Sequence, residues 1–461
     1  MLGVATHTEP TEPPTSAGRS VGRLLLRGGV WVGIVQVLGA GCAAANQMLL
    51  ARLLSPESLA AFFLIQSVVM VGAQLGQLGL TRPLTRLVAV AAGTGEGNRI
   101  PGLLSAAHLL VVATAALVAA IYWRGGGWLA DQVMHSPLMA TGTALGAAWI
   151  VALALQFVTS GGLRGLHRVG EAALVAESSS KILMTLALGA MLLVAGSQGF
   201  LMVLTLAVGV GWATSLLGLG LLAPAFRGGR PAPGTYRTLV WAGIPLAATG
   251  VVHTALHHAD LWIVGWQFSQ EEVALYGAAK RLILVVGLPL MLLRLVLPPV
   301  LAELHAKGEH ERLQRVVRGS ATLAGIPAIL LLLSFMAGSQ FVLGLAFGDF
   351  YRDAAPILTL LCVEQLVFVY VGPAALTLLM AGHETAVMKI TTSMGVFTVA
   401  AVLAGAYLFG FIGVAAGFVT GSVCHQLLLW FFARRLVGIR TDMDFRGLGA
   451  AVDALRRAAG R

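Results

Sequence analysis

About twelve stretches of roughly 20 mostly apolar residues run through the chain, and each is long enough to cross the hydrocarbon core of a bilayer. They cover approximately residues 29–50, 59–80, 103–123, 138–160, 172–194, 200–222, 239–264, 274–300, 322–347, 357–380, 390–409 and 412–432. Only 11% of the 461 residues are charged, whereas a soluble domain carries about a quarter. The sequence therefore predicts an all-α polytopic membrane protein with about twelve transmembrane helices.

The basic residues lie between the apolar stretches, and their distribution predicts the orientation. With a cytoplasmic N-terminus, 23 Lys and Arg residues fall on the inner side, and only Arg52, Arg124 and Arg352 fall on the outer side. Cytoplasmic loops carry the excess of Lys and Arg in membrane proteins. We therefore expect both termini to be cytoplasmic. The net charge of +10 is carried by basic residues between the spans, where it is explained by membrane orientation. No nucleic-acid partner is therefore expected.

An internal repeat predicts two halves. Shifting the chain by 214 residues aligns residues 46–66 with 260–280, and both segments contain the outer turn between the first two spans of a half. Two halves that start on the same side form a parallel repeat, as in many transporters. We expect two pseudo-symmetric six-helix lobes around a central cavity. The predicted divisions are an N-terminal tail (1–28), an N-lobe (29–222), a cytoplasmic Gly/Pro-rich linker (223–238), a C-lobe (239–436) and a basic C-terminal tail (437–461).

Two cations in the eighth span are candidate substrate ligands. Charged side chains inside a span are costly and mark functional sites. Lys280 and Arg294 are 14 residues apart, close to four helical turns, and therefore share one face. A cationic stripe suits a diphosphate; the alternative is that the two side chains snorkel to opposite interfaces. Arg281, off that face, is expected at the outer interface.

Amide side chains occupy the corresponding stripe of the second span. The repeat places Gln66, Gln74 and Gln77 on the face that matches the cationic stripe. Amide groups donate and accept hydrogen bonds and therefore suit sugar hydroxyls. The two helices are predicted to line the cavity, one for the diphosphate and one for the sugars.

Four titratable residues are candidates for coupling to an ion, H+ or Na+. His253, His257 and Asp260 follow one another at steps of four and three on one face of the seventh span. Imidazole and carboxylate groups can exchange protons near neutral pH. Glu364 in the tenth span has no partner on its own helix and is either a proton site or the counter-charge to the eighth-span cations. The alternative for the seventh-span residues is a hydrogen-bonded polar seam between helices.

Motifs for other chemistry are absent from the sequence. It contains no Gly-x-x-x-x-Gly-Lys-Ser/Thr loop, no Gly-x-Ser-x-Gly elbow and no metal-ligand cluster. The cysteines, Cys42, Cys362 and Cys424, each lie inside an apolar stretch and indicate neither a disulfide framework nor a zinc site. We expect no enzymatic activity, no cofactor and no metal. Energy would come from an ion gradient, from substrate disposal on the far side or from a partner.

Several loose motifs resemble a known family in their order and spacing. They are Met48-Leu-Leu-Ala-Arg-Leu-Leu-Ser-Pro-Glu57, Asp260-Leu-Trp-Ile-Val-Gly265, Glu271-Glu-Val-Ala-Leu-Tyr276, Gly348-Asp-Phe-Tyr351 and Phe411-Ile-Gly-Val-Ala-Ala-Gly417. This pattern resembles the polysaccharide transporter branch of the MOP superfamily, the Wzx-type flippases of lipid-linked oligosaccharides and O-antigen. The resemblance covers nearly the whole chain.

The resemblance implies a function and its partners. Such flippases export undecaprenyl-diphosphate-linked oligosaccharides across the bacterial inner membrane by alternating access, for O-antigen, lipopolysaccharide, capsule or exopolysaccharide assembly. The implied partners are that substrate, membrane lipids, a polysaccharide polymerase and a chain-length regulator.

Three alternatives stay open. A multidrug/cation antiporter of the same superfamily typically has an acid in its first span, whereas residues 29–50 contain none. A lipid II flippase usually has two more spans. A membrane polysaccharide polymerase or glycosyltransferase generally has a large outer loop or paired acids in the first outer loop, where this chain has Glu57 alone.

Overall fold

Every regular element in the described part of the chain is a helix. The computed structural model describes residues 16–195, 199–227, 229, 231–287, 297, 301, 304 and 307–444. The first half contains α1 (Ser16–Leu53), α2 (Pro56–Gly76), α3 (Thr81–Gly93), α4 (Ile100–Trp128), α5 (Pro137–Thr141), α6 (Thr143–Gly165), α7 (Val169–Ala173), α8 (Ser179–Ala195) and α9 (Phe200–Leu222). The second half contains α10 (Thr235–Gln267), α11 (Gln270–Val286), α13 (His310–Ala337), α14 (Ser339–Phe347), α15 (Ala355–Val371), α16 (Ala374–Met380) and α17 (Glu384–Phe432).

The predicted spans are confirmed as helices within the residues that the structure describes. Among the described residues, eight helical segments are long and apolar enough to cross a membrane, and a bent pair formed by Val169–Ala176 and Ser179–Leu193 makes a ninth. The longest segment, Glu384–Val437, holds two of the predicted spans, because Gly410 breaks it with a φ of 64°. Glycine adopts such angles at little cost. The predicted first span lies in α1, and the first part of the predicted eighth span lies in α11.

Two boundaries in the structure differ from the predicted ones. The helix α1 begins at Ser16, so residues 16–28, which were predicted as part of the tail, belong to the same helix as the first span. No proline follows Pro14 before the span, and extending a nucleated helix is favourable. The predicted linker, residues 223–238, is shorter, because α10 already begins at Thr235 after Gly234 in the left-handed region.

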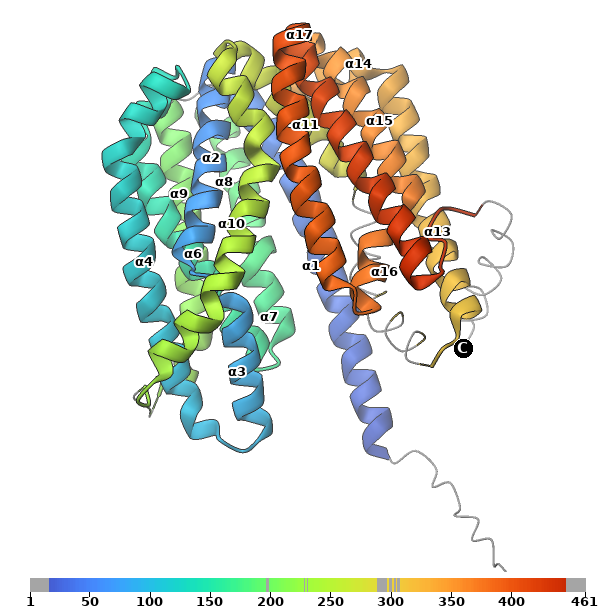
Figure 1. Ribbon diagram of the computed structural model, residues 1–461. Helices are drawn as coiled ribbons and strands as arrows, with labels where there is room; N and C mark the ends of the chain where they lie inside the picture. Colours follow the sequence, from blue (N-terminus) through green and yellow to red (C-terminus); the bar gives the residue numbers. More distant parts are fainter. Residues whose placement is uncertain are drawn as a thin grey trace, which may run out of the picture.

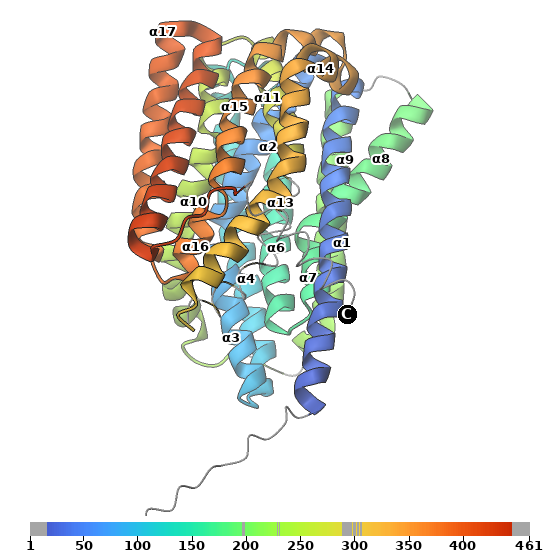
Figure 2. The ribbon, with the colours of Figure 1, turned by 90° about the vertical axis from the view of Figure 1, so that its right-hand side faces the viewer.

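Contacts between helices repeat from one half to the other. In the N-lobe (α1–α9), α1 packs against α8, α2 and α4 against α6, and α6 against α9. In the C-lobe (α10–α17), α10 packs against α17, α11 and α13 against α15, and α15 against α17. Figure 1 shows α2–α9 and α11–α17 as two groups of helices, and Figure 2 shows α1 beside α8. This pattern confirms two pseudo-symmetric lobes.

The two ends of the helix bundle differ in their apolar cores. We call the end with the α2–α3, α6–α7 and α9–α10 connections the basic end, and the end with the α1–α2 and α10–α11 turns the far end. One apolar cluster joins both lobes toward the far end and includes Phe63, Leu64, Tyr276 and Phe347. Toward the basic end the described residues form two clusters, one around Leu84 that also includes Leu239 of α10 and one around Leu378. Toward that end α10 therefore packs with the N-lobe, whereas α11–α17 share a core with the N-lobe toward the far end.

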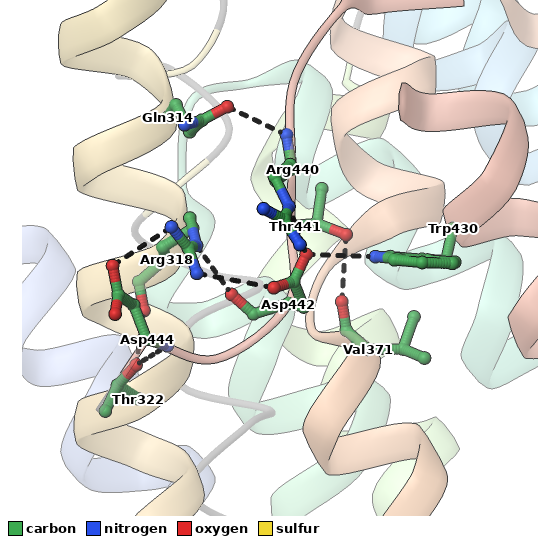
Figure 3. Close-up of polar contacts among 9 residues, drawn as sticks. All are labelled: Gln314, Arg318, Thr322, Val371, Trp430, Arg440, Thr441, Asp442 and Asp444. Carbon is green, nitrogen blue, oxygen red and sulfur yellow. Dashed lines mark hydrogen bonds and ion pairs between the residues drawn. The ribbon is translucent and has the colours of Figure 1, made fainter. Parts of the chain in front are cut away.

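A buried segment follows the last helix. Residues 438–444, which we call the C-terminal strap, run between α13, α15 and α17 (Figure 3). Thr441 donates a hydrogen bond to the Val371 carbonyl at 2.8 Å, and the Met443 N–H donates to the Tyr370 carbonyl at 3.0 Å. Thr441 is fully buried. Residues 438–444 were predicted as part of the basic tail, but they are packed into the C-lobe.

A buried ion pair holds the strap against α13. The Asp442 side chain is only 4% exposed and lies 3.3 Å from the Arg318 guanidinium, which also lies 3.0 Å from Asp444. The indole N–H of Trp430 donates to the other Asp442 oxygen at 3.1 Å (Figure 3). The paired carboxylates explain why an acidic segment enters an apolar lobe, because burying an unpaired charge would be costly.

Removing the strap's cation should destabilise the C-lobe. We expect Arg318→Met to lower the free energy of unfolding in detergent by about 3 kcal/mol, because the buried Asp442 carboxylate loses its guanidinium partner on α13 and keeps only Arg440 of the strap, at 3.6 Å, as a cation. The matched variant Arg312→Met, on the same helix, breaks an exposed pair with Glu309 and should cost less than about 1 kcal/mol. Equal losses in the two variants would show that the strap adds nothing to stability.

Candidate functional site

A polar cleft lies between α2, α3, α6 and α10. Its volume is about 560 Å³. It is lined by Gln74, Gln77, Gly79, Thr81, Arg82, Phe157, Ser160, Arg164, Ala176, Leu246, Thr249, Gly250, His253 and Thr254. These described lining residues include amides, hydroxyls, an imidazole and two guanidinium groups, but no carboxylate. Such a surface offers hydrogen bonds to a polyhydroxylated ligand and charge to an anion.

The amides of the cleft form a ladder at the end of α2. The Gln77 amide donates to the Gln74 amide oxygen at 2.5 Å, and the Thr81 hydroxyl donates to the Gln77 amide oxygen. The turn that follows α2 includes Gly79, whose φ is 64°. A Cβ at Gly79 would lie 2.4 Å from the backbone nitrogen of Ala247 in α10. Glycine is thus required where the turn packs against α10, and this contact holds the ladder at the wall of the cleft.

Two cations of the cleft were not predicted as site residues. Arg82 lies in the first turn of α3, and Arg164 lies in the last turn of α6. Both side chains are exposed, and neither forms an ion pair within the described part of the chain. The sequence analysis assigned both to inner connections on the positive-inside rule, and no local pattern distinguished them from the other basic residues there.

A second polar cluster joins α10 and α11. The Lys280 ammonium lies 2.6 Å from the Asp260 carboxylate, and the Tyr276 hydroxyl donates to the same carboxylate at 2.8 Å. The Lys280 ammonium also donates to the His257 carbonyl at 2.9 Å and lies 5.0 Å from the centre of the Phe418 ring. Asp260 is 2% exposed and the Lys280 side chain 14%. Lys280 is therefore neutralised within the C-lobe in this conformation.

Glu364 lies on α15, which packs against α11, the helix that carries Lys280. Its carboxylate accepts a hydrogen bond from Ser422 of α17 at 2.6 Å. Of the two acids predicted for ion coupling, Asp260 therefore pairs with Lys280, and Glu364 binds a hydroxyl of α17.

The seventh-span histidines occupy different surroundings. His253 lines the cleft, whereas His257 is exposed and packs edge-on against His258 with ring centres 5.5 Å apart. Among the described residues, no three His, Cys, Asp or Glu side chains gather as they would around a metal ion.

The two lobes are held together by contacts between α2 and α11. The Arg281 guanidinium donates to the Gln66 amide oxygen at 2.7 Å and lies 3.5 Å from the centre of the Phe63 ring. A Cβ at Gly277 would lie 2.3 Å from that ring, so only glycine fits there. We call Phe63, Gln66, Gly277 and Arg281 the far-end latch. The prediction that Arg281 lies at the outer interface is wrong, because its guanidinium binds Gln66 and packs on Phe63 of α2.

A further hydrogen bond supports the latch. The indole N–H of Trp262 in α10 donates to the Ser67 hydroxyl of α2 at 2.8 Å. Nearer the far end, the Gln270 amide donates to the Met134 carbonyl at 2.9 Å. The polar contacts between the lobes thus extend along α2 to the far-end turns.

The predicted amide stripe is therefore divided. Gln74 and Gln77 line the cleft, whereas Gln66 belongs to the far-end latch. Arg294, the second predicted cation, lies outside the described residues, so its relation to Lys280 stays a prediction.

Comparisons with known proteins agree on family and fold. The family model described as polysaccharide biosynthesis protein matches residues 25–305, which is more than half of the chain. No curated protein matches the chain. A multidrug resistance MATE family transporter of the MOP superfamily in an inward-facing conformation is 14% identical, covers 88% of this chain and 98% of its own, and superposes with a TM-score of 0.72.

Two other solved structures have the same fold. The lipid II flippase MurJ, in an inward closed conformation, is 12% identical over 88% of this chain and 87% of its own, with a TM-score of 0.68. An outward-facing MATE family transporter of the MOP superfamily is 16% identical over 89% of this chain and 95% of its own, with a TM-score of 0.62. At these identities the likeness establishes the fold alone.

Proposed function

The chain belongs to the polysaccharide biosynthesis protein family, and from this premise we propose that it is a flippase for lipid-linked oligosaccharides. The substrate is an oligosaccharide on undecaprenyl diphosphate, which moves from the inner to the outer leaflet of a bacterial cytoplasmic membrane. The observation that carries the proposal is the cleft between α2, α3, α6 and α10, which amides, hydroxyls and cations line. Sugar hydroxyls and a diphosphate need those partners within the membrane.

We assign the sequence-predicted residues to steps of transport. Gln74 and Gln77 bind sugar hydroxyls in the cleft. Gln66 becomes available to the sugars when the far-end latch opens. Lys280 and Arg294 contact the diphosphate in the cavity after Lys280 leaves Asp260.

Transport proceeds by alternating access in this proposal. The core that α11–α17 share with the N-lobe toward the far end, and the separate clusters around Leu84 and Leu378 toward the basic end, suit a cavity that opens at the basic end. The excess of basic residues there favours a cytoplasmic position for this end and for both termini. Rocking of the lobes would then break the latch and expose the cavity to the other leaflet.

Coupling to an ion is assigned to the residues around Lys280. Asp260 binds the Lys280 ammonium in this conformation, and protonation of Asp260 or Na+ binding there would release Lys280 toward Glu364, which we propose as its second partner. His253 and His257 lie on the same helix as Asp260 and are proposed to relay protons between the cleft and this cluster.

Deletion of the gene tests the function. The undecaprenyl-linked oligosaccharide should accumulate on the cytoplasmic side, as measured by extraction of lipid-linked glycans and by protection from glycosidases added to intact spheroplasts. Re-expression of the chain should restore export. Unchanged glycan amounts and sidedness in the deletion strain would rule out the proposal.

Lipid II transport is the second candidate, because the lipid II flippase MurJ shares the fold at a TM-score of 0.68. The same deletion separates the two functions. Cytoplasmic accumulation of lipid II with normal export of other lipid-linked glycans would favour the second candidate.

A further inference from the structure

We infer that the cleft between α2, α3, α6 and α10 binds the phosphate group of a lipid headgroup, and that Arg82 and Arg164 are its anion ligands. Neither residue belongs to the cationic stripe predicted from the sequence. The site itself rests on the geometry of the cleft; that it holds the diphosphate of the exported lipid before this group reaches Lys280 and Arg294 rests on the proposed function.

The first argument is the balance of charge. Four arginines at the basic end have carboxylate partners, in the pairs Arg99–Glu96, Arg168–Glu171, Arg312–Glu309 and Arg318–Asp442; what distinguishes Arg82 and Arg164 is that both face the same cleft. Arg82 and Arg164 line one cleft whose described lining contains no Asp or Glu. Two like charges on one concave surface repel each other, and an anion between them removes that cost. Phosphate oxygens accept paired N–H bonds from guanidinium groups, which gives both charge and geometry.

The second argument is that the packing of α3 on α6 positions both cations. Gly161 and Gly165 flank Arg164 on α6, and a Cβ at either position would lie 2.7 Å from α3, at the Thr81 carbonyl and the Val88 side chain. The Thr85 hydroxyl lies 2.8 Å from the Gly161 carbonyl and bridges the two helices. The two helices therefore approach closely, and their packing fixes the backbone positions of Arg82 and Arg164 relative to each other.

The third argument is the polarity gradient of the cleft. The amide ladder of Gln74, Gln77 and Thr81 starts next to Arg82 and runs along α2 away from the basic end. Arg82 also lies in the first turn of α3, and helix N-termini favour anions. A headgroup bound with its phosphate at the arginines would thus extend its sugar hydroxyls along the ladder.

Two sources could supply the phosphate: the isoprenyl diphosphate of the exported substrate or an ordinary anionic phospholipid. Both present the same oxyanion chemistry to Arg82 and Arg164, so the experiment uses one probe for each. Farnesyl diphosphate represents the isoprenyl diphosphate, and phosphatidylglycerol represents the phospholipid.

The test measures binding with the full-length protein in nanodiscs. In neutral phosphatidylcholine nanodiscs, we expect added farnesyl diphosphate to raise the thermal unfolding temperature of the wild type. Arg82→Gln and Arg164→Gln should each weaken binding of the probe about tenfold or more, because each removes a charge-assisted hydrogen bond. Arg86→Gln is the matched control: Arg86 is one turn further along α3, is exposed and does not line the cleft. It should bind the probe like the wild type.

A second set of nanodiscs contains phosphatidylglycerol. If phosphatidylglycerol competes with farnesyl diphosphate through Arg82 and Arg164, the phosphate site is supported and its ligand includes bulk phospholipid. If both single variants and the double variant bind farnesyl diphosphate as the wild type does, the inference is wrong, whatever the export assay shows. If the arginines bind the probe but gene deletion leaves every lipid-linked glycan in place, the site stands and the proposed function fails.

Folding is controlled within the same series. Each variant is compared without probe, and Arg82→Lys and Arg164→Lys keep the charge while losing the forked geometry. Intermediate affinity in the lysine variants supports direct phosphate contact. Loss of binding only in variants that also lose thermal stability without probe would count against it.

Discussion

Asp260→Ala is expected to lower the free energy of unfolding in detergent by about 3–5 kcal/mol and to abolish export. The substitution leaves the Lys280 ammonium buried without its carboxylate, and breaking a buried ion pair from one side is strongly destabilising. It also removes the acceptor of the Tyr276 hydroxyl, which is 2.8 Å from Asp260. The measurements are denaturant unfolding of the purified protein and accumulation of lipid-linked glycan in cells.

Two further variants separate stability from transport. Asp260→Ala combined with Lys280→Met removes both charges and should recover most of the lost stability, because no unpaired charge stays buried. Export should stay absent if the pair takes part in ion coupling. Asp349→Ala is the surface control, since Asp349 pairs with Arg352 but its side chain is 86% exposed; its cost should be within about 1 kcal/mol. Full export by the double variant would contradict a coupling role.

A disulfide across the far-end latch is expected to reduce export to the level of vesicles without protein. The variants Phe63→Cys and Gly277→Cys place thiols on α2 and α11, where a Cβ at residue 277 would lie 2.3 Å from the present Phe63 ring. Bridging the lobes here prevents the far end from opening, which alternating access requires. The native cysteines, Cys42, Cys362 and Cys424, are first replaced by alanine or serine. Export is measured with and without reductant.

A disulfide within one lobe provides the control. A Cβ at Gly421 would lie 2.7 Å from the Thr398 Cβ, so Thr398→Cys with Gly421→Cys joins the two halves of α17. This bond crosses no interface between the lobes and should leave export largely unchanged. Full activity of the oxidised latch variant, with its disulfide verified by gel shift, would refute the rocking movement.

The spans were predictable because the bilayer imposes a length and a polarity on every helix that crosses it. The apolar stretches, the break near residue 410 and the pairing of the two halves were all readable along the chain. The repeat was visible because its matching residues lie in a turn, where polar residues are informative. These features depend on local sequence, so one chain was enough to predict them.

The candidate site was predictable only in part. The sequence identified Gln74, Gln77 and Asp260 as polar residues within spans, because such residues are costly there and stand out. Helical spacing also placed Gln66 on one stripe with Gln74, but that rule does not say which neighbouring helix meets each turn. Because α11 packs against α2 near Gln66, the Gln66 amide binds Arg281. Gln74 and Gln77 lie nearer the turn that follows α2 and line the cleft.

The sequence by itself determined that this chain crosses the membrane many times in two related halves, because hydrophobic length and charge position act residue by residue. The tertiary structure alone decided which charges meet. It paired Lys280 with Asp260 and packed Asp442 against Arg318. It also placed Arg82 and Arg164 in one cleft whose described lining contains no Asp or Glu. Each of these outcomes joins residues of separate helices, and the attraction between two charges depends on a distance that no pattern along one helix contains.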